Sequence, residues 1–214
     1  MSDPTPTHAD VFPHTDDNVV PSNDDDMLGA EKSAQHRALR SLIEWVVIIG
    51  GALAVAFIVK TFLLQVFYIP SDSMLPVLER QDRIVVNKLS YRTGEIDRGH
   101  IIVFERPACA QTTEEIKDLI KRVIAVGGET VEGREGGVFI DGQRLAEPYL
   151  PPGTTTGDFA AYDVPAGHVW LMGDNRENSR DSRHLCNGPT PIDEDLVIGR
   201  AFVRIWPPSR LTRL

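Results

Sequence analysis

This sequence has few of the residues that build metal sites and redox centres. Its 214 residues include only two cysteines, Cys109 and Cys186. Their wide separation fits neither a C-x-x-C redox pair nor a zinc site, and we expect no metal and no cofactor. An even count of cysteines permits a Cys109–Cys186 disulfide in an oxidising compartment, although sequence alone does not supply its geometry.

Positive charge is also scarce. The chain has 22 Lys and Arg against 31 Asp and Glu, a formal net charge of −9. No basic stripe stands out, which argues against binding to nucleic acid. The chain has five lysines: Lys32, Lys60, Lys88, Lys117 and Lys121.

The negative charge is concentrated at the N-terminus. Residues 1–26 contain seven Asp and no Lys or Arg, which leaves a net charge of −2 for the rest. This stretch has few large apolar residues, so it cannot bury enough surface to offset its chain entropy. We predict that residues 1–40 form a disordered acidic tail.

The sequence has one long apolar run, WVVIIGGALAVAFIV at residues 45–59. A hydrocarbon core of ~30 Å needs about 20 helical residues, which the run provides when extended to residues 41–64. A cleaved signal peptide would begin near Met1 with basic residues, and a buried helix this apolar would need a large surrounding core. We therefore predict a single transmembrane anchor over residues 41–64.

The orientation of this anchor follows from its flanking basic residues. Lys32, Arg37 and Arg40 precede the run, and Lys60 stands at its far edge. Basic residues near a transmembrane segment remain on the cytoplasmic side. We expect a single-pass protein of the cell membrane, with a cytoplasmic N-terminus and an extracytoplasmic domain over residues 65–214.

This domain reads mostly as strands. Short runs rich in Val, Ile and Phe lie at residues 82–91, 100–107, 119–128, 136–145, 167–174 and 197–206. Asp141-Gly142 is a strong signal for a two-residue hairpin. Only EEIKDLI at 114–120 looks helical, and GTTTGDF at 153–159 reads as an exposed loop. The pattern predicts a mainly β fold, an antiparallel sandwich or a partly closed barrel.

Just beyond the apolar run, IPSDSMLP at residues 69–76 holds Ser71 and Ser73 between prolines. A serine hydroxyl needs a neighbouring base to become a nucleophile. The domain offers three histidines for this role. No G-x-S-x-G elbow marks an α/β-hydrolase, but a histidine-based triad is not excluded. The histidines are His100, His168 and His184.

A lysine is the other candidate base, because burial lowers its pKa and leaves the amine neutral. Lys121 lies within LIKRVIAV, where strand alternation places it on the face of Leu119 and Val123, with Arg122 on the other face. An edge strand with cations on two polar-tolerant faces is the alternative. A third cluster, GDNRENSRDSR at 173–183, is either a solvated turn or a hydrogen-bonded network that supports a site.

These three stretches, with DRIVVNK at 82–88 between them and an anchor before them, resemble the type I signal peptidases (leader peptidases). These are membrane-bound Ser/Lys proteases of bacteria. The resemblance implies that Ser73 is the nucleophile and Lys121 its general base. It implies an oxyanion hole made by the Ser71 hydroxyl and the Ser73 backbone N–H.

The resemblance also assigns supporting roles. It implies that Ser179 orients the lysine amine, that Asp181 and Arg183 form an ion pair bracing their loop, and that Arg122 is structural. Asp72 departs from the pattern, since many members carry glycine between the two serines. If that position needs a positive φ, Asp tolerates it better than most residues.

The implied fold is largely antiparallel β, and the implied function is removal of signal peptides from exported preproteins. Such signal peptides end in small residues. The implied partners are these signal peptides and the lipid bilayer, which confines enzyme and substrate to one surface. A cluster of apolar residues is expected to dip toward the lipid: Phe62, Leu63, Leu64, Phe67 and Tyr68.

Two alternatives to this function remain. One is a related Ser/Lys protease dedicated to a single exported substrate or to itself. The other is a catalytically inactive, membrane-tethered β-domain that binds an exported partner. The presence of Ser73, Lys121 and Ser179 together favours an active enzyme.

Overall fold

The computed structural model describes residues 40, 42–57, 59, 63–110 and 116–214. The chain divides into two compact units, residues 1–53 and 54–214. The predicted tail lies outside the described residues except for residue 40. Residues 42–57 are helical, and their large apolar side chains are exposed.

The predicted anchor over residues 41–64 stays a prediction. Within the described ranges, no helix is both long and apolar enough to cross a membrane. Leu64, at the end of the predicted anchor, is the first residue of a strand.

The described residues of the second unit form twelve strands. They are β1 (Leu64–Tyr68), β2 (Arg83–Asn87), β3 (Ile101–Glu105), β4 (Asp118–Val126), β5 (Thr130–Arg134), β6 (Gly137–Ile140), β7 (Gln143–Arg144), β8 (Phe159–Asp163), β9 (His168–Met172), β10 (Ile192–Asp193), β11 (Val197–Trp206) and β12 (Thr212–Arg213). The described helical turns are α2 (Ser90–Thr93), η2 (Ala108–Ala110), η3 (Glu194–Leu196) and η4 (Pro208–Arg210).

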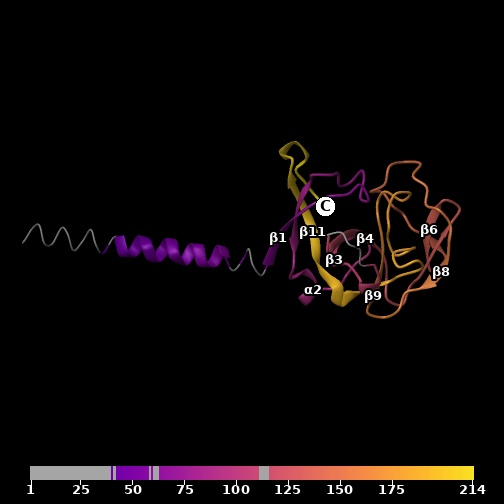
Figure 1. The fold of residues 1–214 in the computed structure, drawn as a ribbon, viewed down its shortest axis with the longest axis horizontal. Coiled ribbons are helices and arrows are strands. Elements are labelled where there is room, and N and C mark those ends of the chain that lie inside the picture. The colour runs from indigo at the N-terminus through magenta and orange to yellow at the C-terminus, as the bar shows by residue number, and fades with distance from the viewer. Residues whose placement is uncertain (1–39, 41, 58, 60–62, 111–115) are drawn as a thin grey trace, which may run out of the picture. The chain divides into compact units, whose positions relative to one another are not determined.

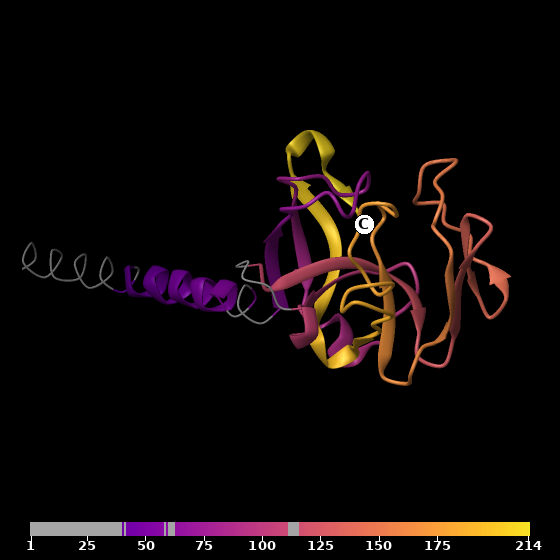
Figure 2. The same ribbon diagram turned by 45° about the vertical axis from the view of Figure 1, so that its right-hand side comes forward.

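The strands form two antiparallel sheets. The larger has the order β1-β2-β11-β3-β4-β9-β10, with β12 added to β11, and the smaller has the order β7-β6-β5-β8. Register shifts interrupt β11 against β2 and β3, and such bulges bend a strand. Figure 2 shows β11 curving along its length, and Figure 1 shows β6 and β8 at the end of the domain opposite β1. The predicted mainly β, antiparallel fold is confirmed, with the larger sheet curled but open.

The strand predictions succeed where apolar residues are frequent. Each of the six runs contains a strand, and Asp141 and Gly142, with φ of 51° and 77°, join β6 to β7 as a tight turn. The helix predicted at 114–120 is wrong at its C-terminal end, because residues 118–120 begin β4 and pair with β3. Its start lies partly outside the described residues. Pairing along a neighbouring strand overrides the local helical pattern there.

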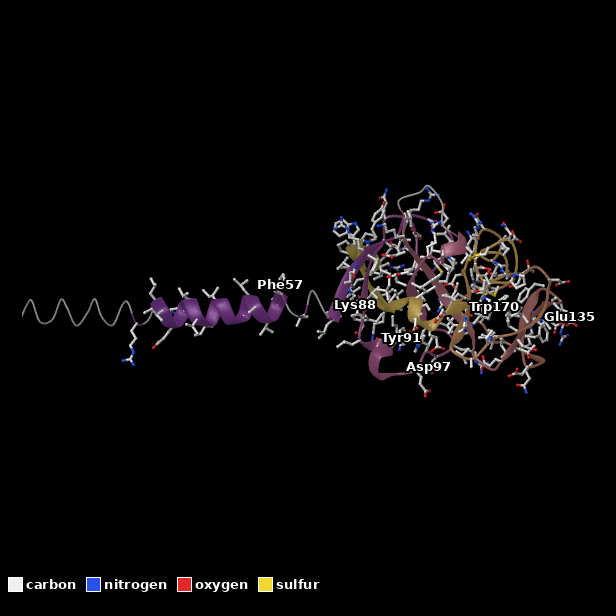
Figure 3. The ribbon with its side chains drawn as sticks, turned by 60° about the horizontal axis from the view of Figure 1, so that its bottom comes forward. Phe57, Lys88, Tyr91, Asp97, Glu135 and Trp170 are labelled. Carbon is white, nitrogen blue, oxygen red and sulfur yellow. A yellow bond between two sulfur atoms is a disulfide. The ribbon has the colours of Figure 1, made fainter. Side chains whose placement is uncertain are left out.

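Three apolar clusters make the core. The first lies on β2, β3 and β11, the second on β3, β4 and β9, and the third joins β4 and β9 to β5 and β6 of the smaller sheet. In the third, the rings of Phe159 and Tyr162 lie 5.8 and 5.1 Å from that of Trp170. Figure 3 shows Trp170 inside the domain and Glu135 pointing outward from the turn between β5 and β6.

The segment between β1 and β2, residues 69–82, is called the Ser loop here. Ile69, Met74 and Leu78 of this loop are buried in the first core cluster. Burying each side chain contributes about 1.5–3 kcal/mol, which fastens the loop to the sheet. Phe67 packs partly on the same cluster, whereas Tyr68 is exposed. Of the apolar residues expected to dip toward the lipid, Tyr68 is therefore exposed and Phe67 is partly buried. Phe62 lies outside the described residues.

A buried carboxylate closes the Ser loop at its end. Asp82 is 1% exposed and accepts hydrogen bonds from the Glu79 backbone N–H at 2.8 Å, Arg204 Nη1 at 3.3 Å and Arg210 Nη1 at 3.1 Å. Arg204 Nη1 also donates to the Val77 carbonyl at 2.6 Å. This ion-pair network ties the loop to the C-terminal half of β11.

We predict that Asp82→Ala lowers the free energy of unfolding by about 3 kcal/mol, because it leaves Arg204 buried without its counter-charge. Chemical denaturation of the detergent-solubilised chain measures this change. Asp158→Ala, at an exposed position, is the control and should stay within about 0.5 kcal/mol of the parent. Equal effects of the two substitutions would contradict the prediction.

Candidate active site

Ser73 and Lys121 meet across the fold. Lys121 Nζ donates a hydrogen bond to Ser73 Oγ at 2.8 Å and another to the Ile120 carbonyl at 2.9 Å. Ser73 is held by the buried Met74 that follows it, and Lys121 by the pairing of β4 with β3 and β9. Two residues far apart in the sequence therefore form one polar pair within an apolar setting.

Lys121 is only 4% exposed. Burial lowers its pKa from 10.5 to about 8, although Asp181 and Asp174 oppose this by favouring the charged amine; Arg106 adds to the lowering. Burial dominates because a charged amine loses its hydration inside the protein. The neighbouring residues pack on two sides as alternation requires: Ile120 joins the first core cluster, and Leu119 and Val123 join the second.

Ser71 lies at the mouth of this site. Its Oγ is 3.4 Å from Ser73 Oγ, and its side chain is exposed. The three predicted residues Ser71, Ser73 and Lys121 are thus brought together, with the hydroxyl of Ser71 on the solvent side.

The histidine alternative has no geometric support. Among the hydrogen bonds recorded in the described chain, those of Ser73 Oγ are to Lys121 and Ser71. His100 Nδ1 is 3.2 Å from Tyr91 Oη, His168 Nδ1 is 3.2 Å from the Ala166 carbonyl, and His184 is exposed. None of these three described histidines is therefore in place to accept the Ser73 proton.

The 173–183 loop follows β9 and holds the Ser loop from the other side. Asn175 donates through its backbone N–H to the Ser73 carbonyl at 3.1 Å and through Nδ2 to the Asp72 carbonyl at 3.0 Å. A Cβ atom on Gly173 would overlap both Ser179 Oγ and the Ser73 carbonyl. Glycine is needed at 173 because these two segments approach its backbone so closely.

Buried ion pairs brace the 173–183 loop. Arg183 donates to both carboxylate oxygens of Asp181 at 2.8 Å, and Asp181 also accepts from the Gly173 N–H at 3.0 Å. Burial favours the neutral form of Asp181, but Arg183 and the Gly173 N–H outweigh it and lower its pKa. The carboxylate therefore stays charged beside the site.

Arg122 is held by a second pair. It donates to both oxygens of Asp174, at 2.8 and 2.6 Å, and to the Gly99 carbonyl at 2.8 Å. Its guanidinium also stacks over the ring of Tyr149 at 3.8 Å. These contacts connect β4, which carries Lys121, to the 173–183 loop.

Ser179 is buried, at 5% exposed. Its Oγ has no partner of ordinary hydrogen-bond geometry within the described part of the chain, although the Ser179 side chain does interact with the Asp181 carboxylate and helps to lower its pKa. The contact with the lysine amine implied by the resemblance is not formed in this structure. Ser179 Oγ and the Ser73 carbonyl oxygen both lie close to Gly173.

Asp72 adopts an ordinary backbone conformation and is not among the described residues with a positive φ. Aspartate between the two serines is therefore not strained. Cys109 of η2 and Cys186 form a disulfide, with Cα atoms 5.5 Å apart, which links the segment before β4 to the segment after the 173–183 loop.

Sequence reasoning missed part of the support. Arg176 is buried and donates to Glu147, to Thr156 Oγ1 at 2.9 Å and to the Gly173 carbonyl at 3.1 Å. Thr156 lies in the stretch predicted as an exposed loop, where it is the buried residue. No local sequence pattern marks Glu147 or Thr156 as partners of Arg176. These contacts are seen only in the folded structure.

A cavity of about 450 Å³ opens beside the Ser loop, bounded by Leu75 and Pro76, by residues 151–155 and by residues 174–177. It lies where the Ser loop and the 173–183 loop meet.

Similar proteins of known family are found over most of this chain. The family model described as "Signal peptidase, peptidase S26" matches residues 42–206. A signal peptidase I from Leptolyngbya laminosa is 41% identical over 186 residues, covering 85% of this chain and 88% of the relative. The signal peptidase I of Mycobacterium tuberculosis is 35% identical over 234 residues, covering 86% and 80%.

A signal peptidase I structure from Enterococcus faecalis V583 aligns with 50% of this chain and 96% of its own, at 28% identity and a TM-score of 0.40. The family match and the two curated relatives decide the assignment. The chain belongs to the signal peptidase family, peptidase S26, and is a type I signal peptidase, a serine endopeptidase.

Proposed function

We propose that signal peptide removal by this S26 serine protease proceeds through a Ser73–Lys121 dyad at the outer face of the cell membrane. The observation that carries the proposal is the 2.8 Å contact between Ser73 Oγ and the buried Lys121 amine, whose pKa is lowered to about 8. A neutral amine at this distance is within reach of the hydroxyl proton.

The reaction begins with Lys121 in its neutral form. Its amine accepts the Ser73 proton while Ser73 Oγ forms a bond to the scissile carbonyl carbon. The carbonyl electron pair becomes an oxyanion. In the structure Lys121 Nζ donates the hydrogen bond to Ser73 Oγ. Once the amine is deprotonated, its lone pair can accept a hydrogen bond from the Ser73 hydroxyl instead.

The proposed oxyanion hole consists of the Ser73 backbone N–H and the Ser71 hydroxyl. The short spacing of the two serine hydroxyls, 3.4 Å, supports a shared binding position for the carbonyl oxygen. Donors placed where charge develops are each worth about 2.7–4 kcal/mol of barrier lowering.

The tetrahedral intermediate then collapses. The C–N bond breaks, and the Lys121 ammonium gives its proton to the departing amine, which becomes the new N-terminus of the mature protein. Lys121, neutral again, accepts a proton from water as the water oxygen attacks the acyl carbon. The Ser73–acyl bond breaks, and the proton returns to Ser73 Oγ.

The remaining predicted residues support this pair. We propose that Asp181 and Arg183 keep the 173–183 loop closed on the Ser loop, and that Arg122 fixes β4 through Asp174. Ser179 is buried beside Gly173 and interacts with the Asp181 carboxylate. We propose that it turns toward the lysine amine when substrate fills the site.

The proposed substrate is a preprotein whose signal peptide ends in small residues. An extended chain passing Ser73 would run beside the neighbouring cavity of about 450 Å³. Membrane attachment through residues 41–64 would hold enzyme and substrate on one surface. The uncharged run at 45–59 and the exposed apolar side chains of the helix at 42–57 support this anchor.

Family membership favours an enzyme over a catalytically inactive binding domain. An inactive domain would not need a neutral amine against a hydroxyl in its interior. Restriction to one exported substrate, or to self-cleavage, would differ only in which peptide enters the same site.

We predict that Ser73→Ala and Lys121→Ala each lower kcat by a factor on the order of 10⁴ or more, because the two residues act as one unit. Ser71→Ala should lower kcat by roughly 10²–10³ through loss of one oxyanion donor. The measurement is cleavage of a signal-peptide substrate by the detergent-solubilised chain. His184→Ala is the control, and a loss of activity there with Lys121→Ala still active would sink the dyad.

The lowered pKa of Lys121 predicts the pH profile. Because the base must be deprotonated, kcat/KM should fall about tenfold per pH unit below pH 8 and level off above it. Initial rates at low substrate concentration between pH 5.5 and 10 measure this. A profile governed by a group near pH 6.5 would point to histidine instead.

We predict that the chain remains in the membrane after an alkaline carbonate wash, because about 20 apolar residues insert stably. Protease added outside spheroplasts should digest residues 65–214 and leave an N-terminal epitope intact. Release by carbonate, or digestion of the epitope, would contradict the anchor or its orientation.

A further inference from the structure

A charged side chain stands between the two proposed oxyanion donors. Asp72 separates Ser71 from Ser73, and its carboxylate is held by Arg80. Arg80 Nε donates to Asp72 Oδ1 at 2.9 Å, and Arg80 Nη2 lies 2.9 Å from Oδ2. Two parallel contacts of this kind fix the carboxylate in direction as well as distance.

The backbone of Asp72 is held independently of its side chain. Its carbonyl accepts from the Leu75 N–H at 3.1 Å and from Asn175 Nδ2 at 3.0 Å. Because the peptide unit is planar and trans, fixing this carbonyl also fixes the direction of the Ser73 N–H. The Asp72–Arg80 pair is therefore additional to the contacts that position this backbone.

The chemistry of the site creates an electrostatic problem at Asp72. The oxyanion develops next to the Ser73 N–H, roughly 6–8 Å from a carboxylate one residue away, given 3.8 Å between consecutive Cα atoms. An unpaired carboxylate would oppose that charge. It would also favour the protonated form of Lys121 and raise the pKa of the amine.

We propose that Arg80 is a positioning residue for catalysis, which neutralises the Asp72 carboxylate and holds it away from the developing oxyanion. This inference rests on the proposed Ser73–Lys121 chemistry. Arg80 makes its contact from the far end of the Ser loop and on the solvent side, since its side chain is 64% exposed. Exposed ion pairs add little stability, so its effect should appear in the rate.

The test is a double-mutant cycle on the full chain in detergent, with Arg80→Ala, Asp72→Asn and the combined variant. Arg80→Ala should lower kcat by about three- to fiftyfold, the range that Coulomb's law gives for 7 Å between effective dielectric constants of about 80 and 20. KM should change little. Asp72→Asn alone should stay near the parent, and the combined variant should recover to within about threefold of it.

Two further readouts separate an electrostatic role from a structural one. In Arg80→Ala the acidic limb of the kcat/KM profile should move to higher pH, because the freed carboxylate joins Asp181 and Asp174 in favouring charged Lys121 against Arg106. Added salt should reduce the defect, because exposed charges are screened. Arg134→Ala removes another exposed ion-paired arginine, from the smaller sheet, and is the matched control with parent activity.

The result that overturns the proposal is a combined variant as slow as Arg80→Ala, or Arg80→Ala with parent kcat and an unmoved profile. Ser73→Ala and Lys121→Ala are assayed in parallel. If either retains parent activity, the dyad itself fails. If both are inactive while Arg80→Ala equals the parent, only the role of Arg80 fails.

Discussion

One interior contact, that of the Lys121 amine with the Ser73 hydroxyl, sets the condition that the surrounding structure has to meet. An amine that is 4% exposed and whose pKa falls from 10.5 to about 8 destabilises the folded protein by about 3 kcal/mol when it is charged. The three apolar clusters and the paired strands offset this. The same burial that opposes folding makes the amine neutral enough to accept a proton.

Around this contact the polar groups are arranged in pairs. Asp174 with Arg122, Asp181 with Arg183 and Glu147 with Arg176 each satisfy buried charges. Buried ion pairs are weak evidence for stability, but each fixes the relative position of two segments. Here they connect β4, the 173–183 loop and the loops of the smaller sheet. The site is thus held by its charged neighbours as much as by its core.

The sequence predicts the fold where composition is decisive. Strands rich in Val, Ile and Phe are found from their apolar residues, and the Asp141-Gly142 turn from its chemistry. Strands β5 and β8 were missed because TVEGR and FAAYD carry Gly, Ala or charges, and their pairing comes from distant partners. Ser73 and Lys121 are predicted from their motifs, and the structure brings them into contact. The contacts of Thr156 with Arg176 and of Arg80 with Asp72 follow from no local pattern.

The cysteine pair and the two halves of the proposed dyad share one property: each joins positions far apart in the chain. Ser73 and Lys121 are separated by 48 positions, and the pKa of the amine is lowered only when β4 is covered by its neighbours. An unfolded polypeptide accordingly has neither the short contact between Ser73 and Lys121 nor the lowered pKa of the amine. Under the proposed mechanism, proteolytic activity therefore arises only together with the finished fold.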